Sequence, residues 1–129
     1  MLWNGVGQYG YPLLQFWFRF PIVRAIFNWW LTNMSEYLPV NKISETQTLL
    51  CFHHPNPSYA LHILLMPKKD IQSLTQLDQE QNEFLLDLFA TVRSLIQEFK
   101  LEEKGYRLVV NGGEYQEFPQ LHFHLISEN

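Results

Sequence analysis

Two of the five histidines in this chain of 129 residues, His122 and His124, stand two residues apart in an apolar stretch near the carboxyl terminus. Successive side chains of a strand point to opposite faces, so residues two apart share a face at a spacing of roughly 7 Å. On that pattern Gln120, His122 and His124 project together, while the apolar residues between them face a core. Polar groups are costly to bury without hydrogen bonds, which favours a row that lines a cleft.

This imidazole pair supports two kinds of chemistry. A neutral ring nitrogen can attack phosphorus and form a covalent phosphoramidate, while a neighbouring imidazole or amide donates hydrogen bonds to the phosphate oxygens. The same pair can instead bind a metal ion, with His62 or His54 as a further ligand. The third interpretation is a structural or surface role, and the His-x-His spacing by itself leaves all three open.

Composition narrows the class of partner. Nine basic and thirteen acidic residues give a net charge of −4 with neutral histidines, which argues against a nucleic-acid partner but leaves room for a small phosphate ligand. A single cysteine, Cys51, excludes an internal disulfide framework and a cysteine-rich zinc site. The 47% of hydrophobic residues predicts one domain with its own core.

The elements that must position the histidines follow from the hydrophobic pattern. We expect a helix that begins at Asp78, with Gln81 as its capping-box partner, and continues to Gly105. We expect Lys68 and Lys69 to form a solvated strand end. The predicted fold class is α+β, with one long helix packed on an antiparallel sheet of five strands. These strands are predicted over 41–44, 48–52, 60–66, 106–110 and 120–126.

The first 39 residues differ in composition from the domain expected over 40–129. All four tryptophans lie within the first 30 residues, and the apolar spacing of 22–38 predicts a helix with a wide apolar face. We expect this aromatic-rich extension, 1–39, to cover the sheet or a partner subunit, with contact to a membrane surface as the alternative. No uncharged apolar run of about 20 residues and no signal-peptide pattern is present, so a cytoplasmic location is expected.

Two stretches resemble the histidine triad (HIT) family. Residues 110–126 are similar to its signature region: a turn with asparagine and glycines, a glutamine, then three alternating histidines with apolar residues between. Residues 50–69 are similar to the family's strand, ribose-site loop and histidine-containing strand that ends in Pro-Lys. The resemblance covers about 40–126 in order and does not extend to 1–39.

The resemblance implies a fold, an activity and a partner. Family members have a compact antiparallel sheet with helices and commonly form two-fold dimers, so a homodimer is expected. They hydrolyse or transfer nucleoside monophosphate groups and need no metal for the covalent step. We therefore expect a nucleotide or a nucleotide-derived phosphate compound as partner, and no cofactor.

Site residues follow from the same resemblance. His122 matches the family's nucleophile, and His124 matches a residue that binds phosphate. Gln116 and Asn111 match the glutamine and the turn asparagine that help to hold the ligand. His62 matches a supporting histidine on the apolar strand.

Two positions depart from the family pattern. Gln120 replaces the first histidine of the triad, and an amide donates a hydrogen bond but does not carry a proton at neutral pH. We expect Gln120 to bind phosphate nonetheless. His54 stands where the family has the acidic or amide residue that grips the ribose hydroxyls. An enzyme and a nucleotide-binding module that has lost turnover are both compatible with these changes.

Overall fold

The computed structural model describes residues 19–21, 24, 41–116 and 118–128. Nearly all of the expected extension over 1–39 lies outside the described residues, including the predicted helix apart from Arg24. No helix in the described part of the chain is both long and apolar enough to cross a membrane.

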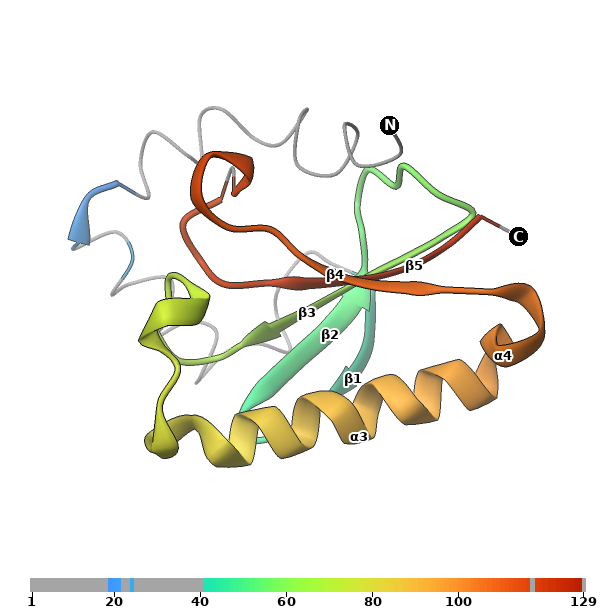
Figure 1. Cartoon of the computed structure of the whole chain (residues 1–129), viewed down its shortest axis with the longest axis horizontal. Coiled ribbons are helices and arrows are strands. Elements are labelled where there is room, and N and C mark those ends of the chain that lie inside the picture. The colour runs from blue at the N-terminus through green and yellow to red at the C-terminus, as the bar shows by residue number, and fades with distance from the viewer. Residues whose placement is uncertain (1–18, 22–23, 25–40, 117, 129) are drawn as a thin grey trace.

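Five antiparallel strands form a single sheet in the order β1-β2-β3-β5-β4 (Figure 1). The structure confirms the α+β class, the five strands and the one long helix. The strands are β1 (Lys42–Glu45), β2 (Leu49–His53), β3 (Leu61–Pro67), β4 (Arg107–Val110) and β5 (Phe123–Ser127).

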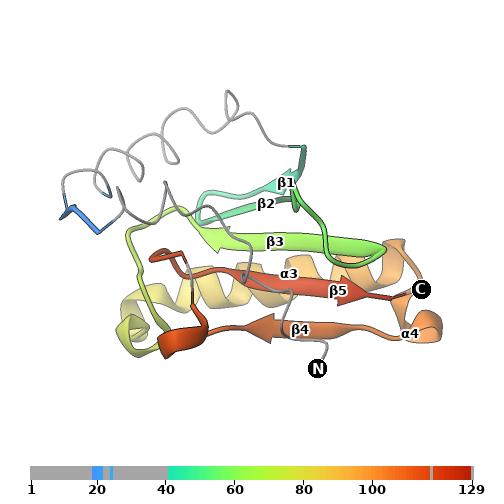
Figure 2. The same cartoon turned by 90° about the horizontal axis from the view of Figure 1, so that it is seen from above.

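The long helix α3 (Asn82–Glu98) runs along one face of this sheet (Figures 1 and 2). The predicted capping box is present: the Asp78 carboxylate accepts from the Glu80 N–H at 2.8 Å, and Gln81 accepts from the Asp78 N–H at 2.8 Å. It caps a short 3₁₀ turn, Gln79–Gln81, that leads into α3. The helix buries a stripe at three- and four-residue spacing, formed by Phe84, Leu88, Val92, Leu95 and Ile96.

The predicted single helix to Gly105 is wrong, because the helix is broken after Glu98. Lys100 adopts a left-handed conformation with φ 56°, and a second short helix, α4 (Leu101–Lys104), follows. A residue other than glycine seldom takes this backbone conformation without a compensating contact. Here the compensation is the burial of Leu101, which is 1% exposed and belongs to the main core.

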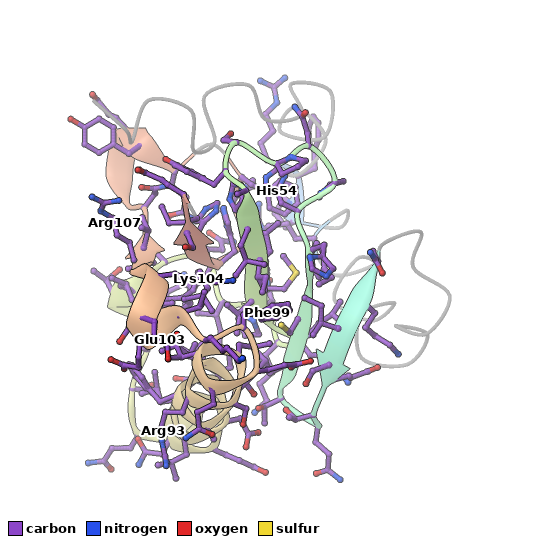
Figure 3. All side chains as sticks on the ribbon, turned by 90° about the vertical axis from the view of Figure 1, so that its right-hand side faces the viewer. His54, Arg93, Phe99, Glu103, Lys104 and Arg107 are labelled. Atoms are coloured by element: carbon purple, nitrogen blue, oxygen red, sulfur yellow. The ribbon has the colours of Figure 1, made fainter. Side chains whose placement is uncertain are left out.

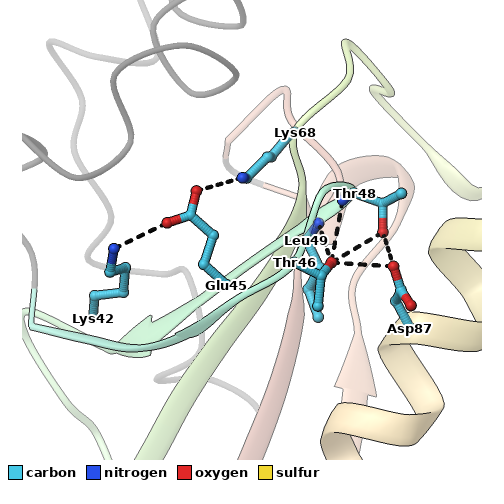
Figure 4. A network of polar contacts seen from close by, with 7 residues as sticks. All are labelled: Lys42, Glu45, Thr46, Thr48, Leu49, Lys68 and Asp87. Carbon is cyan, nitrogen blue, oxygen red and sulfur yellow. Dashed lines mark hydrogen bonds and ion pairs between the residues drawn. The ribbon is translucent and has the colours of Figure 1, made fainter.

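A threonine pair ties the turn between β1 and β2 to α3 (Figure 4). Thr46 Oγ1 donates to Asp87 Oδ2 at 3.1 Å, and Thr48 Oγ1 donates to the same oxygen at 2.5 Å. The Asp87 carboxylate therefore holds the turn between β1 and β2 against α3.

The expectation of a solvated Lys68 is wrong. Its ammonium group pairs with Glu45, which also contacts Lys42 at 2.9 Å (Figure 4). The Lys68 side chain is buried at the end of β3, and a buried ammonium needs such a partner because desolvation is costly. Lys68 is thus a structural residue, while Lys69 is exposed as expected.

The face of the sheet away from α3 carries two kinds of side chain. Strand alternation places His62, Leu64 and His124 on it, and Leu64 is paired in register with His124. A small apolar cluster adjoins them on this face, and each member is at most 9% exposed: Leu50, Phe52, Leu64 and Met66.

Candidate functional site

Four of the five histidines meet on this face of the sheet. His54 lies in the loop after β2, His62 on β3, His122 just before β5 and His124 on β5. The ring centroids of His54 and His62 are 4.3 Å apart, those of His62 and His124 5.2 Å, and those of His122 and His124 4.9 Å. Figure 3 shows His54 on the side of the sheet away from α3. We call these four residues the histidine cluster.

Gln120 does not join the histidines, so the predicted row of three side chains from one strand is wrong. Strand β5 begins only at Phe123, and the Gln120 side chain is buried beside the end of β3. Its amide donates to the carbonyl oxygens of Pro67 at 3.1 Å and Lys69 at 2.8 Å. Buried carbonyls need donors, and both amide hydrogens are used to satisfy these two. The expected donation from Gln120 to phosphate is therefore corrected to a structural role.

The main-chain carbonyl of Gln120 orients His122. It lies 2.8 Å from His122 Nδ1, and because a carbonyl only accepts, the ring proton resides on Nδ1. The Nε2 atom of His122 then carries a lone pair. Burial lowers the pKa of this imidazole below its ordinary value, partly opposed by the bond to Gln120. The ring is therefore neutral at neutral pH while remaining partly exposed.

A chain of hydrogen bonds fixes the protons on the two buried rings. The Ser58 main-chain N–H donates to His62 Nδ1 at 3.1 Å, which places the His62 proton on Nε2. Nε2 of His62 lies 2.9 Å from Nδ1 of His124 and donates to it. The proton of His124 is thereby placed on Nε2, a buried atom with no hydrogen-bond partner in the part of the chain that the structure describes. A buried donor without an acceptor is rare in proteins, so this N–H is a candidate contact for a ligand oxygen.

Electrostatics keep this pair neutral. Burial, followed by the neighbouring His54 and His122, lowers the pKa of His62 to about 4. Burial, followed by His122, His62 and His54, lowers the pKa of His124 to about 2. Each ring would have to take a charge out of water and beside other imidazoles, so the cluster offers uncharged nitrogens at neutral pH.

The other two predicted ligand residues lie outside the histidine cluster. The Gln116 amide donates to the carbonyl oxygens of Gln72 at 2.5 Å and Phe118 at 3.0 Å, so a contact with phosphate requires one of these bonds to break. Asn111 directly follows β4 and is partly buried, and no hydrogen bond joins it to the cluster within the described residues. Its role toward a ligand stays a prediction.

Two aromatic residues flank the cluster and were missed in the sequence. The Phe118 ring stands edge-on to His122 at 6.2 Å, and the Tyr59 ring stands edge-on to His62 at 5.4 Å. Phe118 directly precedes Pro119, which restricts it to an extended conformation, and this was the available signal; Tyr59 offered none. The Ser58 N–H and the Gln120 carbonyl also belong to the site. Because both are main-chain groups, the identity of the side chain at each position does not indicate this role.

The metal-binding interpretation gains no support from this geometry. Over the described ranges, no group of three or more histidine, cysteine or carboxylate side chains is arranged to hold a metal ion. The two nitrogens that face one another, on His62 and His124, share a proton and are unavailable as a ligand pair while that bond persists.

Comparisons with known proteins agree with the geometry. The family model described as the HIT domain matches residues 36–129. A HIT-like protein of Helicobacter pylori is 32% identical over 92 residues, which is 70% of this chain and 86% of that protein. The crystal structure of a HIT family hydrolase from Legionella pneumophila is similar with a TM-score of 0.69 and 27% identity, over 78% of this chain and 91% of the other. The crystal structure of a histidine triad nucleotide-binding protein from Candida albicans is similar with a TM-score of 0.67 and 27% identity, over 81% of this chain and 74% of the other.

Proposed function

The chain belongs to the HIT family, and from this premise we propose that it hydrolyses or transfers nucleotidyl groups through a covalent intermediate on His122. The observation that carries the proposal is the assignment of protons in the histidine cluster. His122 presents a lone pair on Nε2, and His124 presents an N–H donor on Nε2 from the same cluster. A nucleophile beside an unpaired donor suits the attack on a phosphate ester or phosphoramidate.

The proposed reaction has two displacements at one phosphorus atom. In the first, the Nε2 lone pair of His122 forms a bond to the α-phosphorus of a nucleotide, and the bond from phosphorus to the leaving group breaks with its electron pair. The leaving group then takes a proton from water. In the second, water or another acceptor attacks the phosphorus, loses a proton to solvent, and the P–N bond breaks to restore the lone pair on Nε2.

The surrounding groups stabilise the charges of these steps. The phosphorylated imidazole carries a positive charge, and the carbonyl of Gln120 accepts a hydrogen bond from its Nδ1–H. The Nε2–H of His124 donates to a phosphate oxygen as negative charge develops there. The similarity to the Legionella HIT family hydrolase and to the Candida histidine triad nucleotide-binding protein supports this substrate class.

A nucleotide-binding module without turnover is the second candidate. The observation that favours it is Gln120, because this residue replaces an ionisable side chain with an amide that is committed to two carbonyls. The two candidates differ only in whether bound nucleotide is converted.

One experiment separates them. Wild-type protein and His122→Ala are incubated with labelled nucleoside phosphoramidates and dinucleoside polyphosphates, and the mass of the protein is measured after rapid denaturation at alkaline pH. We expect product release and a nucleotidyl adduct with wild type only. His53→Ala is the control, because this histidine ends β2 outside the cluster. Equal and slow release by all three proteins, with nucleotide still bound, favours the binding module instead.

The proposal extends to a homodimer. Strand β4 is an edge of the sheet, so one side of its backbone has no strand partner among the described residues. Leu86 and Phe89 of α3 are 74% and 54% exposed, which leaves apolar surface on the helix. Sedimentation equilibrium tests the dimer, and Phe89→Glu is expected to shift the protein towards monomer. A wild-type protein that sediments as a monomer at micromolar concentration contradicts this extension.

A further inference from the structure

The loop 68–73, which follows β3, is bonded to the segment that carries the nucleophile. The main-chain N–H of Leu121 donates to the carbonyl oxygen of Ile71 at 2.8 Å. Both residues are buried, and Leu121 directly precedes His122. Water does not compete for a buried hydrogen bond, so the backbone at His122 is fixed against this loop. Whatever holds the loop therefore also holds the nucleophile.

The Gln116 side chain makes a second link between the same two segments. Its Nε2 donates to the carbonyl oxygen of Gln72 in the loop at 2.5 Å and to that of Phe118 at 3.0 Å. A side-chain amide has two N–H donors, and both are used here. The Phe118 ring stands edge-on to His122, with the ring centroids 6.2 Å apart. Gln116 thus joins the loop to an aromatic neighbour of the nucleophile.

Arg24 holds the loop from its other side. With the Gln72 amide oxygen facing the guanidinium, this oxygen accepts from Arg24 Nε at 2.6 Å and from Nη2 at 3.0 Å. The opposite orientation would set N–H groups against N–H groups, so the guanidinium selects the first one. Both residues are partly buried, which limits competition from water. Hydrogen bonds from a charged donor are the stronger kind, so Gln72 is held firmly.

Arg24, Gln72 and Gln116 form a continuous series of contacts, which we call the brace. Arg24 precedes the matched HIT domain, which begins at residue 36, whereas the rest of the brace lies within that domain. We propose that Arg24 is a positioning residue: through the brace, it holds the imidazole of His122 in place for attack on phosphorus. The inference rests on the proposed function, because the reaction it serves is the one at His122.

Kinetics of the full chain test this role. With the 5′-phosphoramidate of adenosine as substrate, we expect kcat of Arg24→Gln to fall about fivefold while KM stays within about twofold, because a misplaced nucleophile affects the transition state more than binding. Arg24→Lys keeps the charge without the planar fork and should recover part of the loss. Arg19→Gln is the matched control. It removes the same charge from the same segment, where the Arg19 guanidinium lies over the Phe20 ring at 5.3 Å, and should keep wild-type kinetics.

A double-mutant cycle tests whether the effect passes through the brace. Gln72→Ala keeps the main-chain carbonyl that Gln116 contacts but removes the contact with Arg24. We expect it to lower kcat as Arg24→Gln does, and the double variant to lose no more than about twofold beyond either single variant. Losses that multiply in the double variant overturn the inference, because the two residues would then act independently.

NMR spectra of the same variants give a measurement that needs no turnover. In wild type the His122 ring should show one protonated nitrogen, Nδ1, and one bare nitrogen, Nε2. In Arg24→Gln the two ¹⁵N shifts should move towards one another, and the side-chain NH₂ of Gln116 should exchange with solvent faster. If Arg24→Gln does not fold, Gln72→Ala provides both measurements.

The two sets of measurements separate this inference from the proposed function. Changed NMR signals in Arg24→Gln, in a protein whose wild type has no turnover, contradict the covalent reaction and support the positioning of His122. Wild-type NMR signals and wild-type kcat in Arg24→Gln overturn the inference and leave the covalent reaction standing. An equal loss of kcat in Arg19→Gln also overturns the inference, because the effect would then be one of charge alone.

Discussion

The imidazole of His62 donates from Nε2 to Nδ1 of His124 across the paired strands β3 and β5, at 2.9 Å. The direction of this bond is set by one main-chain group, the N–H of Ser58, which occupies the other nitrogen of His62. A loop amide thereby decides that His124 carries its proton on the atom that has no hydrogen-bond partner among the described residues. His62 is a positioning residue in this scheme.

Replacing His62 should therefore change how His124 is protonated. His62→Phe removes the donor, which lets the His124 proton move to Nδ1, and we expect kcat/KM to fall about tenfold or more. His62→Gln keeps an N–H donor and should lose less. The ¹⁵N chemical shifts of the His124 ring measure the tautomer directly. If the ¹⁵N shifts of His124 and the kinetics of His62→Phe are both the same as in wild type, His62 is not a positioning residue.

Stability should depend on acid through the same two rings. The folded-state pKa values of His62, about 4, and His124, about 2, both lie below the ordinary value of 6.5. Below pH 6.5 the unfolded chain therefore binds more protons at these two rings than the folded chain does. Their contribution to the free energy of unfolding is complete above pH 6.5 and is lost as the pH falls towards 4 and below. We expect the urea midpoint to decrease over this range, and less steeply in His62→Phe. An equal pH dependence in both proteins would contradict this assignment.

Removing the buried amide of Gln120 should destabilise the domain. In Gln120→Ala the carbonyls of Pro67 and Lys69 lose their donor, and we expect the free energy of unfolding to fall by about 3 kcal/mol. In Gln120→His a neutral imidazole offers one N–H for two acceptors, so stability should also fall and turnover should not increase. Chemical denaturation measures both variants, with exposed Gln97→Ala as the control. A stable, more active Gln120→His protein would show that the residue faces the ligand.

The apolar face beside the cluster gives a prediction for the first 39 residues, which lie almost wholly outside the described part. We expect the aromatic segment to cover Leu50, Phe52, Leu64 and Met66, whose burial needs a covering layer on the face away from α3. Deleting residues 1–39 should lower the unfolding temperature and increase binding of a hydrophobic dye. If the deletion leaves stability and oligomeric state unchanged and abolishes binding to liposomes, the result supports the alternative, in which the segment contacts a membrane surface.

Local patterns in the sequence determined most of the fold. The apolar run of β3, the capping box at Asp78 and the apolar stripe of α3 are each read within one element, where the spacing of side chains is fixed by backbone geometry. The break at Lys100 was not readable in this way. It depends on the burial of Leu101 in a core that other elements build.

The same division holds at the site. The sequence by itself determined that His122 and His124 lie close together near the carboxyl end of the chain, because two residues in extended backbone share a face. Only the tertiary structure decided that His54 and His62 join them, that Gln120 is directed to the end of β3 and which nitrogens carry protons. Those outcomes depend on hydrogen bonds between segments far apart in the chain and on main-chain groups, which every residue type except proline offers alike.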